Sequence, residues 1–218
     1  MPVKKLIGYD LDGTLADTRK DIVEGVRAML KAMHKPDLSA EEIEKCVGEG
    51  LNHLVSKTLG ETDPKIVEQG ARHLRKYYKE HLLDFTTLYP SAQNVLERFK
   101  DRIQIVITNK PEPFTTRILT ELGVLPYLKG IYTGEQGLPH KPDPASLLKV
   151  MSDHGVKKEE VLWVGDSAID AETGKRAGVE TVLLRHGFSS RQRLEDLGAN
   201  YLVDDFAGLL KLADQNGW

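Results

Sequence analysis

The sequence predicts an α/β protein with a doubly wound, mainly parallel Rossmann-like sheet core and an inserted helical cap domain. Two observations predict this class. Short, almost continuously apolar segments alternate with helical segments, which is typical of a parallel sheet covered on both faces. One long stretch near the N-terminus interrupts the alternation and contains helical patterns only.

Six strand-like segments carry the first observation. They are short and partly β-branched, and they cover residues 3–9, 103–108, 129–133, 161–164, 179–184 and 201–203. The segment 129–133 is the weakest of them. The helices between them are expected to stop at glycines, which favour the left-handed cap of a helix. These helices cover residues 112–122, 142–154, 170–177 and 191–197.

The helical stretch runs from about residue 16 to residue 87 and contains no convincing strand. Ser39 and Glu42 form a capping-box pattern ahead of an apolar run. Asp63 and Pro64 open a long helix, with Asp as the N-cap and Pro in the first turn. Connections between a strand and a helix are normally short. We therefore expect a helical cap over residues 16–87 and an α/β core formed by residues 1–15 and 88–218.

Composition excludes several classes of protein. The 218 residues are 40% hydrophobic, which is enough for a core, and the net charge of −3 lacks the basic excess of dedicated nucleic-acid binders. Cys46 is the single cysteine, so an internal disulfide or a cysteine zinc site is excluded. No apolar run reaches the length of a membrane span or a secretory signal. We expect a cytoplasmic globular protein without nucleic-acid or membrane partners; the sequence does not indicate its oligomeric state.

A paired carboxylate motif ends the first expected strand, and it reads Asp10-Leu11-Asp12-Gly13-Thr14. Ligands of open α/β sheets bind at this edge. Two carboxylates two residues apart on an extended backbone can face the same side. Their repulsion requires a nearby cation. Asp-Gly is also a common turn pair, so a purely structural turn is the alternative.

Two further polar clusters precede helices in the second half of the chain. Thr108 and Asn109 directly follow the strand at 103–108, and a hydroxyl and an amide suit phosphate oxygens. Lys141 is flanked by two prolines in His-Lys-Pro-Asp-Pro, which suits an ammonium directed at an anion. The alternatives are a strand-end turn and an ordinary surface lysine.

The last cluster, Gly-Asp-Ser-Ala-Ile-Asp, follows the strand at 161–164 and contains Asp166 and Asp170. Two carboxylates four residues apart at a strand end can converge on one hard cation. Oxygen ligands select Mg²⁺ where a substrate phosphate is also present. The alternative is that Asp166 and Ser167 only cap the following helix.

The set and order of these four clusters resemble the haloacid dehalogenase-like (HAD) phosphatase superfamily. Asp-x-Asp-Gly-Thr-Leu-x-Asp-Thr, Thr-Asn-Lys-Pro, Lys-Pro-x-Pro and Gly-Asp-Ser-x-x-Asp look most like its phosphoglycolate phosphatase branch. With the helical insert, the resemblance covers nearly the whole chain. It implies a phosphoric monoester hydrolase that forms an aspartyl-phosphate.

The resemblance also implies roles for single residues. Asp10 would be the nucleophile, and Asp12 would protonate the leaving alkoxide and then activate water. Lys141 and Thr108 would stabilise the charge on the transferred phosphoryl group. Mg²⁺ would be held by Asp10, the Asp12 carbonyl and Asp166, with Asp170 completing or orienting the shell. Asn109 and the amides that follow Asp10, at Gly13 and Thr14, would bind phosphate.

The insert would act as a mobile lid that excludes water. Its loop Val47-Gly48-Glu49-Gly50-Leu51 is expected to face the substrate and to bind it through Gly48, Glu49 and Gly50. The alternative is two helix caps without ligand contact. The expected substrate is a small phosphorylated metabolite, first of all 2-phosphoglycolate. A pyrophosphatase, a nucleotide or sugar-phosphate phosphatase, or a phosphosugar mutase stays open. In a different class, a phosphoacceptor switch without turnover also combines acidic residues, Thr and Lys on such a sheet.

Overall fold

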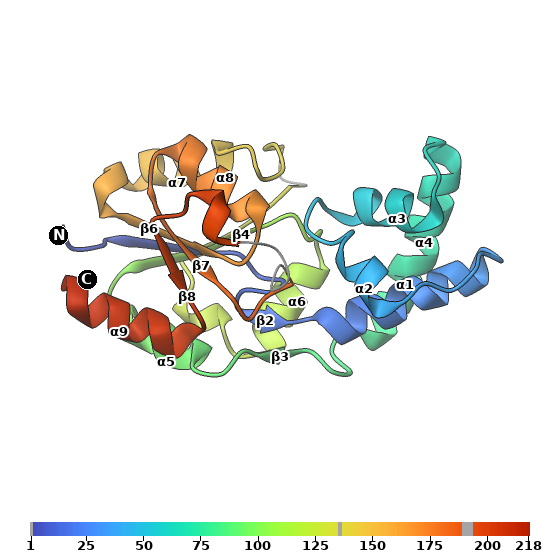
Figure 1. Ribbon diagram of the computed structural model, residues 1–218, viewed down its shortest axis with the longest axis horizontal. Helices are drawn as coiled ribbons and strands as arrows, with labels where there is room; N and C mark the ends of the chain where they lie inside the picture. Colours follow the sequence, from blue (N-terminus) through green and yellow to red (C-terminus); the bar gives the residue numbers. More distant parts are fainter. Residues whose placement is uncertain (1, 135–136, 189–193) are drawn as a thin grey trace.

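A six-stranded parallel sheet forms the centre of the computed structural model, which describes residues 2–134, 137–188 and 194–218 (Figure 1). The strands pair in the order β5-β4-β1-β6-β7-β8, each parallel to its neighbours. Their bounds are β1 Leu6–Tyr9, β4 Ile103–Thr108, β5 Gly130–Thr133, β6 Val161–Gly165, β7 Glu180–Leu184 and β8 Tyr201–Val203. Every expected strand overlaps one of these six, and the predicted fold class is confirmed.

Helices cover both faces of this sheet. On one side lie α7 (Ala145–His154) and α8 (Ala168–Ala177), and on the other α5 (Ala92–Arg98) and α9 (Phe206–Asn216) (Figure 1). Strands β1, β4 and β6 are almost fully buried between them, which explains their nearly continuous apolar sequences. The remaining elements of this part are α6 Phe114–Glu121 and the 3₁₀ turns Leu125–Tyr127, Lys158–Glu160 and Leu194–Leu197.

The register brings the ends of the central strands to one edge. Tyr9, the last residue of β1, pairs with Val106 in β4 and with Val164 in β6. The backbone amide of Asp10 then donates to the Val164 carbonyl at 3.0 Å. Side chains just past these strands therefore gather at the edge where open α/β sheets bind ligands.

Four helices lie apart from the sheet, at the right of Figure 1. They are α1 Arg19–Ala32, α2 Ala40–Glu44, α3 Leu51–Leu59 and α4 Pro64–His81. Their starts follow the expected signals, because Ser39 and Glu42 form the capping box of α2 and Asp63 caps α4 through the Lys65 amide. They bury apolar residues such as Met29 and Val55, both fully buried, and this apolar cluster continues into the one that contains Tyr9 and Phe99.

Two expectations about the secondary structure need correction. Residues 16–87 were expected to contain no strand, but β2 (Ala16–Asp17) and β3 (Thr87–Leu88) pair antiparallel at the two ends of this stretch. Strands of two residues are too short to show a periodicity. The helix expected over 191–197 is a 3₁₀ turn from Leu194 to Leu197, and its first three residues lie outside the described residues. In the part of the chain that is described, no helix has both the length and the apolar character needed to cross a bilayer.

Candidate active site

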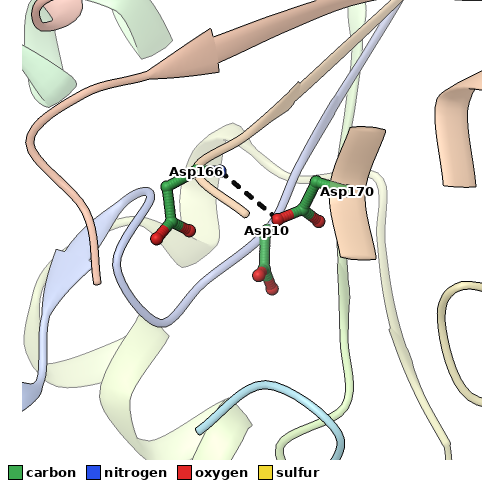
Figure 2. Close-up of side chains that lie close together, drawn as sticks. All are labelled: Asp10, Asp166 and Asp170. Atoms are coloured by element: carbon green, nitrogen blue, oxygen red, sulfur yellow. Dashed lines mark hydrogen bonds between the residues drawn. The ribbon is translucent and has the colours of Figure 1, made fainter. Parts of the chain in front are cut away.

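Three carboxylates from separate segments meet at the strand-end edge (Figure 2). Asp10 directly follows β1, Asp166 directly follows β6, and Asp170 lies in the first turn of α8. Each offers one oxygen, and these three oxygens all lie within 4.8 Å of one another. The Asp166 amide also donates to Asp170 Oδ2 at 3.3 Å, the dashed line in Figure 2.

Neighbouring residues hold the last two carboxylates in place. Asp166 accepts hydrogen bonds from the Thr14 hydroxyl and the Phe188 amide, both at 2.8 Å. Ser167 is the N-cap of α8 and donates its hydroxyl to Asp170 Oδ2 at 2.6 Å. Ser167 therefore does cap the helix, whereas the Asp166 side chain turns to other partners and is available to the site.

Lys141 is the buried cation of this cluster. Its Nζ lies 2.8 Å from Asp10 Oδ1 and 2.8 Å from Asp170 Oδ1, and its side chain is 3% exposed. Burial alone would lower the pKa of Lys141, but the charges of Asp10 and Asp170 outweigh it and raise that pKa. The ammonium is therefore permanently charged, and the reading as a surface lysine is wrong.

Asn109 ties this lysine to the rest of the site. Its side-chain amide donates to the carbonyl of Lys141 at 2.9 Å and to the carbonyl of Gly48 at 2.8 Å. Its Oδ1 accepts from the Lys141 amide at 2.8 Å. Asn109 thus connects the end of β4, the lysine loop and the loop between α2 and α3.

The three carboxylates outnumber the cation beside them. Burial raises the pKa of Asp10 to about 7, with Lys141 lowering it and Asp170 raising it. Burial and the charges of Asp170 and Asp10 raise the pKa of Asp166 well above its usual value. Buried carboxylates of like charge are unfavourable without compensation. A hard divalent cation fits this set of oxygen donors and would supply the missing positive charge.

Binding of a divalent cation should therefore stabilise the fold. At about a hundred times its dissociation constant, an ion that binds only the native state adds about 2.7 kcal/mol, or roughly 5–10 °C in melting temperature for a chain of this size. Thermal unfolding with chelator and with added Mg²⁺ measures this shift. Asp166→Asn should reduce it, while Asp214→Asn, at an exposed position paired with Arg98, should keep it. An equal shift in both variants would contradict the assignment of the cluster.

Asp12 lies outside the carboxylate cluster, beside a second lysine. Its Oδ1 accepts from the Thr18 hydroxyl at 2.6 Å and forms an ion pair with Lys110 Nζ at 2.9 Å. The Lys110 side chain is 7% exposed and lies 5.1 Å from the centre of the Tyr78 ring. From the sequence, Tyr78 is expected only to pack within its helix, and Lys110 has no expected role although it stands within the Thr-Asn-Lys-Pro motif.

A cavity of about 350 Å³ opens between the strand ends and the helices at residues 19–81. From the sheet side, its lining includes Asp10, Asp12, Thr108, Asn109, Lys110, Asp166 and Ser167. From the helical side come mostly apolar groups, among them Ile22, Val47, Leu51, Leu54, Leu74 and Tyr78. The site is thus a small pocket with a charged floor and a largely apolar roof.

Gly13 and Thr14, which were expected to bind phosphate, lie next to the Asp166 side chain. Gly13 has a φ of +81°, and a Cβ there would lie 2.5 Å from Asp166 Oδ2. The Gly13 and Thr14 amides donate to the carbonyls of Ala16 and Leu11, and neither residue belongs to the cavity lining. The structure therefore places both as supports of Asp166. A direct contact from either to phosphate stays a prediction.

Only part of the loop expected to face the substrate lines the cavity. Gly48 and Gly50 line the cavity, and Gly48 holds the Asn109 amide. Glu49 is exposed instead and lies 3.4 Å from His53 on α3. Glu49 is not among the described residues that line the cavity. A substrate contact by Glu49 therefore stays a prediction.

Known proteins with similar sequences and structures share this architecture. The family model of the haloacid dehalogenase-like hydrolases matches residues 7–184. A phosphoglycolate phosphatase of Pseudomonas savastanoi is 33% identical over 215 residues, which cover 94% of this chain and 78% of that protein. The phosphoglycolate phosphatase of Haemophilus influenzae is 32% identical, covering 95% of this chain and 97% of that protein.

A solved structure agrees with these relatives. The crystal structure of a protein described as a predicted phosphoglycolate phosphatase from Haemophilus somnus superposes with a TM-score of 0.92 at 30% identity. The superposition covers 98% of this chain and 99% of that one. The family model, the relatives and the strand-end carboxylates agree: this chain belongs to the haloacid dehalogenase-like hydrolases.

Proposed function

We propose that this protein is a Mg²⁺-dependent phosphatase that hydrolyses a small phosphorylated metabolite, with 2-phosphoglycolate as the first candidate. The observation that carries the proposal is the Asp10 carboxylate, which lines the cavity, pairs with the buried Lys141 and belongs to a cation-compatible cluster. The names of the relatives at 33% and 32% identity supply the candidate substrate.

Asp10 and Asp12 divide the chemistry. A carboxylate oxygen of Asp10 attacks phosphorus, the bond from phosphorus to the ester oxygen breaks, and that oxygen takes a proton from Asp12. The products are the free alcohol and an aspartyl-phosphate. Asp12 then accepts a proton from water as the water oxygen attacks phosphorus, which frees phosphate and the Asp10 carboxylate. Both side chains line the cavity, as this sequence of steps requires.

The remaining charges stabilise the transferred group. Lys141 lies 2.8 Å from Asp10 and offsets the repulsion between a carboxylate and a phosphate dianion. Thr108 lines the cavity and would donate its hydroxyl to an equatorial oxygen. Asp10 and Asp166 would hold Mg²⁺ with the Asp12 carbonyl, while Asp170 orients the set through Lys141. Bound Mg²⁺ supplies further charge neutralisation of the phosphoryl oxygens.

We assign residues 16–87 as the lid and residues 1–15 and 88–218 as the catalytic core. The assignment is supported by the position of α1–α4 apart from the sheet and by the cavity they cover. Closing a site excludes water other than the attacking molecule. A cavity of about 350 Å³ has room for a small metabolite and excludes a phosphorylated protein segment.

Rates on a panel of phosphate esters test the function. We expect Mg²⁺-dependent release of phosphate from a generic aryl phosphate and from several metabolites, with phosphoglycolate giving the highest kcat/KM. The panel includes pyrophosphate, nucleoside monophosphates and sugar phosphates. A low kcat/KM for phosphoglycolate relative to the other esters would contradict the proposed substrate but not the proposed phosphatase activity. A long-lived phosphoprotein without turnover of any ester would instead support a phosphoacceptor switch, and isomerised sugar phosphate a mutase.

A further inference from the structure

Lys110 is a buried cation that the transfer of the phosphoryl group does not use. It lies two residues past the end of β4, lines the cavity, and its side chain is 7% exposed. Its Nζ is 2.9 Å from Oδ1 of Asp12, the residue proposed to protonate the leaving oxygen. Within the described residues, Asp12 is the one hydrogen-bond partner of Lys110 Nζ.

The charges around the cavity make this lysine distinctive. The lining contains five acidic residues, Asp10, Asp12, Glu41, Glu44 and Asp166, and two cations, Lys45 and Lys110. Lys45 is exposed and lies 3.1 Å from Glu41, at the outer side. Lys141 is paired with Asp10 and Asp170 and is not among the described residues that line the cavity. Among the described residues that line the cavity, Lys110 is therefore the buried cation that can contact a ligand.

We propose that Lys110 binds a carboxylate on the leaving group and so selects short phosphorylated carboxylic acids. The inference rests on the proposed function and deepens it. An ammonium has three donors, and one of them serves Asp12. Because Asp12 must reach the ester oxygen to protonate it, a donor 2.9 Å from Asp12 reaches groups one carbon beyond that oxygen.

The surroundings of Lys110 favour a short acid over other leaving groups. The Tyr78 ring centre lies 5.1 Å from Nζ, and this ring packs edge-on against Phe114. Both rings and Leu74 form an apolar part of the cavity wall. These side chains provide few hydrogen-bond partners for the several hydroxyls of a sugar. Farther out, Glu41 and Glu44 would repel a second phosphate or a longer anion. The wall and the charges thus accept one negative group close to the ester oxygen.

Two matched pairs of ligands test the inference. The substrates are phosphoglycolate and its neutral amide, compared by kcat/KM. The inert ligands are phosphonopropionate, in which a methylene replaces the ester oxygen, and propylphosphonate, which lacks the carboxylate. Their dissociation constants are measured by calorimetry with Mg²⁺ present. In each pair the two ligands differ only in the group at the position assigned to Lys110.

Lys110→Met should remove the preference for the acid. Hydrogen bonds to charged groups correspond to about 10- to 100-fold in affinity, so we expect the acid-to-amide ratio of kcat/KM to fall by that factor, mainly through KM. The preference for phosphonopropionate over propylphosphonate should fall likewise. Lys110→Arg should keep most of both preferences. Lys45→Met, which removes the other lining cation, should leave both ratios within about twofold.

The outcomes separate this inference from the proposed function. An equal loss of kcat/KM on the acid and the amide, with unchanged discrimination between the two phosphonates, would overturn the role of Lys110 and show that it acts only through Asp12. If the wild-type protein hydrolyses no ester at all, the proposed function fails. The two phosphonates then still decide whether Lys110 reads a carboxylate, and calorimetry of the two variants gives the answer.

Discussion

Asp10→Asn is expected to lower kcat on an aryl phosphate by at least about a thousandfold, because the amide is not a nucleophile towards phosphorus. The fold should remain intact. The substitution removes one of three clustered carboxylates, and Lys141 keeps its 2.8 Å contact with Asp170. Release of phosphate in the presence of Mg²⁺ measures the effect, and the unfolding transition in chelator checks the stability.

The control for this variant is Asp153→Asn. Asp153 lies on the surface in α7, where it pairs with Lys149 at 2.7 Å, far from the cavity lining. Its replacement should leave kcat within about twofold and stability within roughly 0.5 kcal/mol. If Asp10→Asn kept most of the activity, the assignment of Asp10 as the nucleophile would be wrong, whatever the activity of Asp153→Asn.

Lys141→Met is expected to produce the largest loss of stability. The ammonium is the shared partner of Asp10 and Asp170, and its removal leaves two buried carboxylates uncompensated. Breaking such a buried pair costs about 3–5 kcal/mol. Denaturant unfolding in chelator should show this loss. Part of it should return with Mg²⁺, since a bound cation compensates the same charges. The turnover number should fall at least about a hundredfold even with Mg²⁺.

Lys149→Met provides the matched control, because it deletes a half-exposed lysine that also pairs with one carboxylate. Its effect on the free energy of unfolding should stay below about 1 kcal/mol. If Lys141→Met unfolded at the same denaturant concentration as the wild-type protein in chelator, the cluster would not depend on this cation, and the electrostatic account of the site would be wrong.

The sequence predicts the sheet well because its central strands are buried on both faces. Largely apolar, β-branched runs such as the one at Ile103–Thr108, interrupted only by Gln104 before its final Thr108, have few alternatives in a chain of this size. The pairing of Ala16 with Leu88 escaped prediction for the opposite reason. It joins positions far apart in the chain through two residues on each side, and no local pattern marks such a contact.

The acidic part of the site was also predictable, because each carboxylate follows a strand whose end lies at the same edge. The partners of these carboxylates were not. Asn109 was expected to bind phosphate, yet its side chain is held by the carbonyls of Gly48 and Lys141, contacts that span 61 and 32 residues. Lys110 stands within the Thr-Asn-Lys-Pro motif, but the sequence does not show that its side chain is buried against Asp12.

The small ribbon formed by β2 and β3 has a consequence for how such enzymes diversify. The segment 18–86 is connected to the rest of the chain at both ends by two paired strands, Ala16–Asp17 and Thr87–Leu88. Length changes within this segment alter the cavity roof, while the six paired strands keep their register. The cavity roof can therefore be reshaped as one unit without disturbing the strand-end edge that carries the carboxylates.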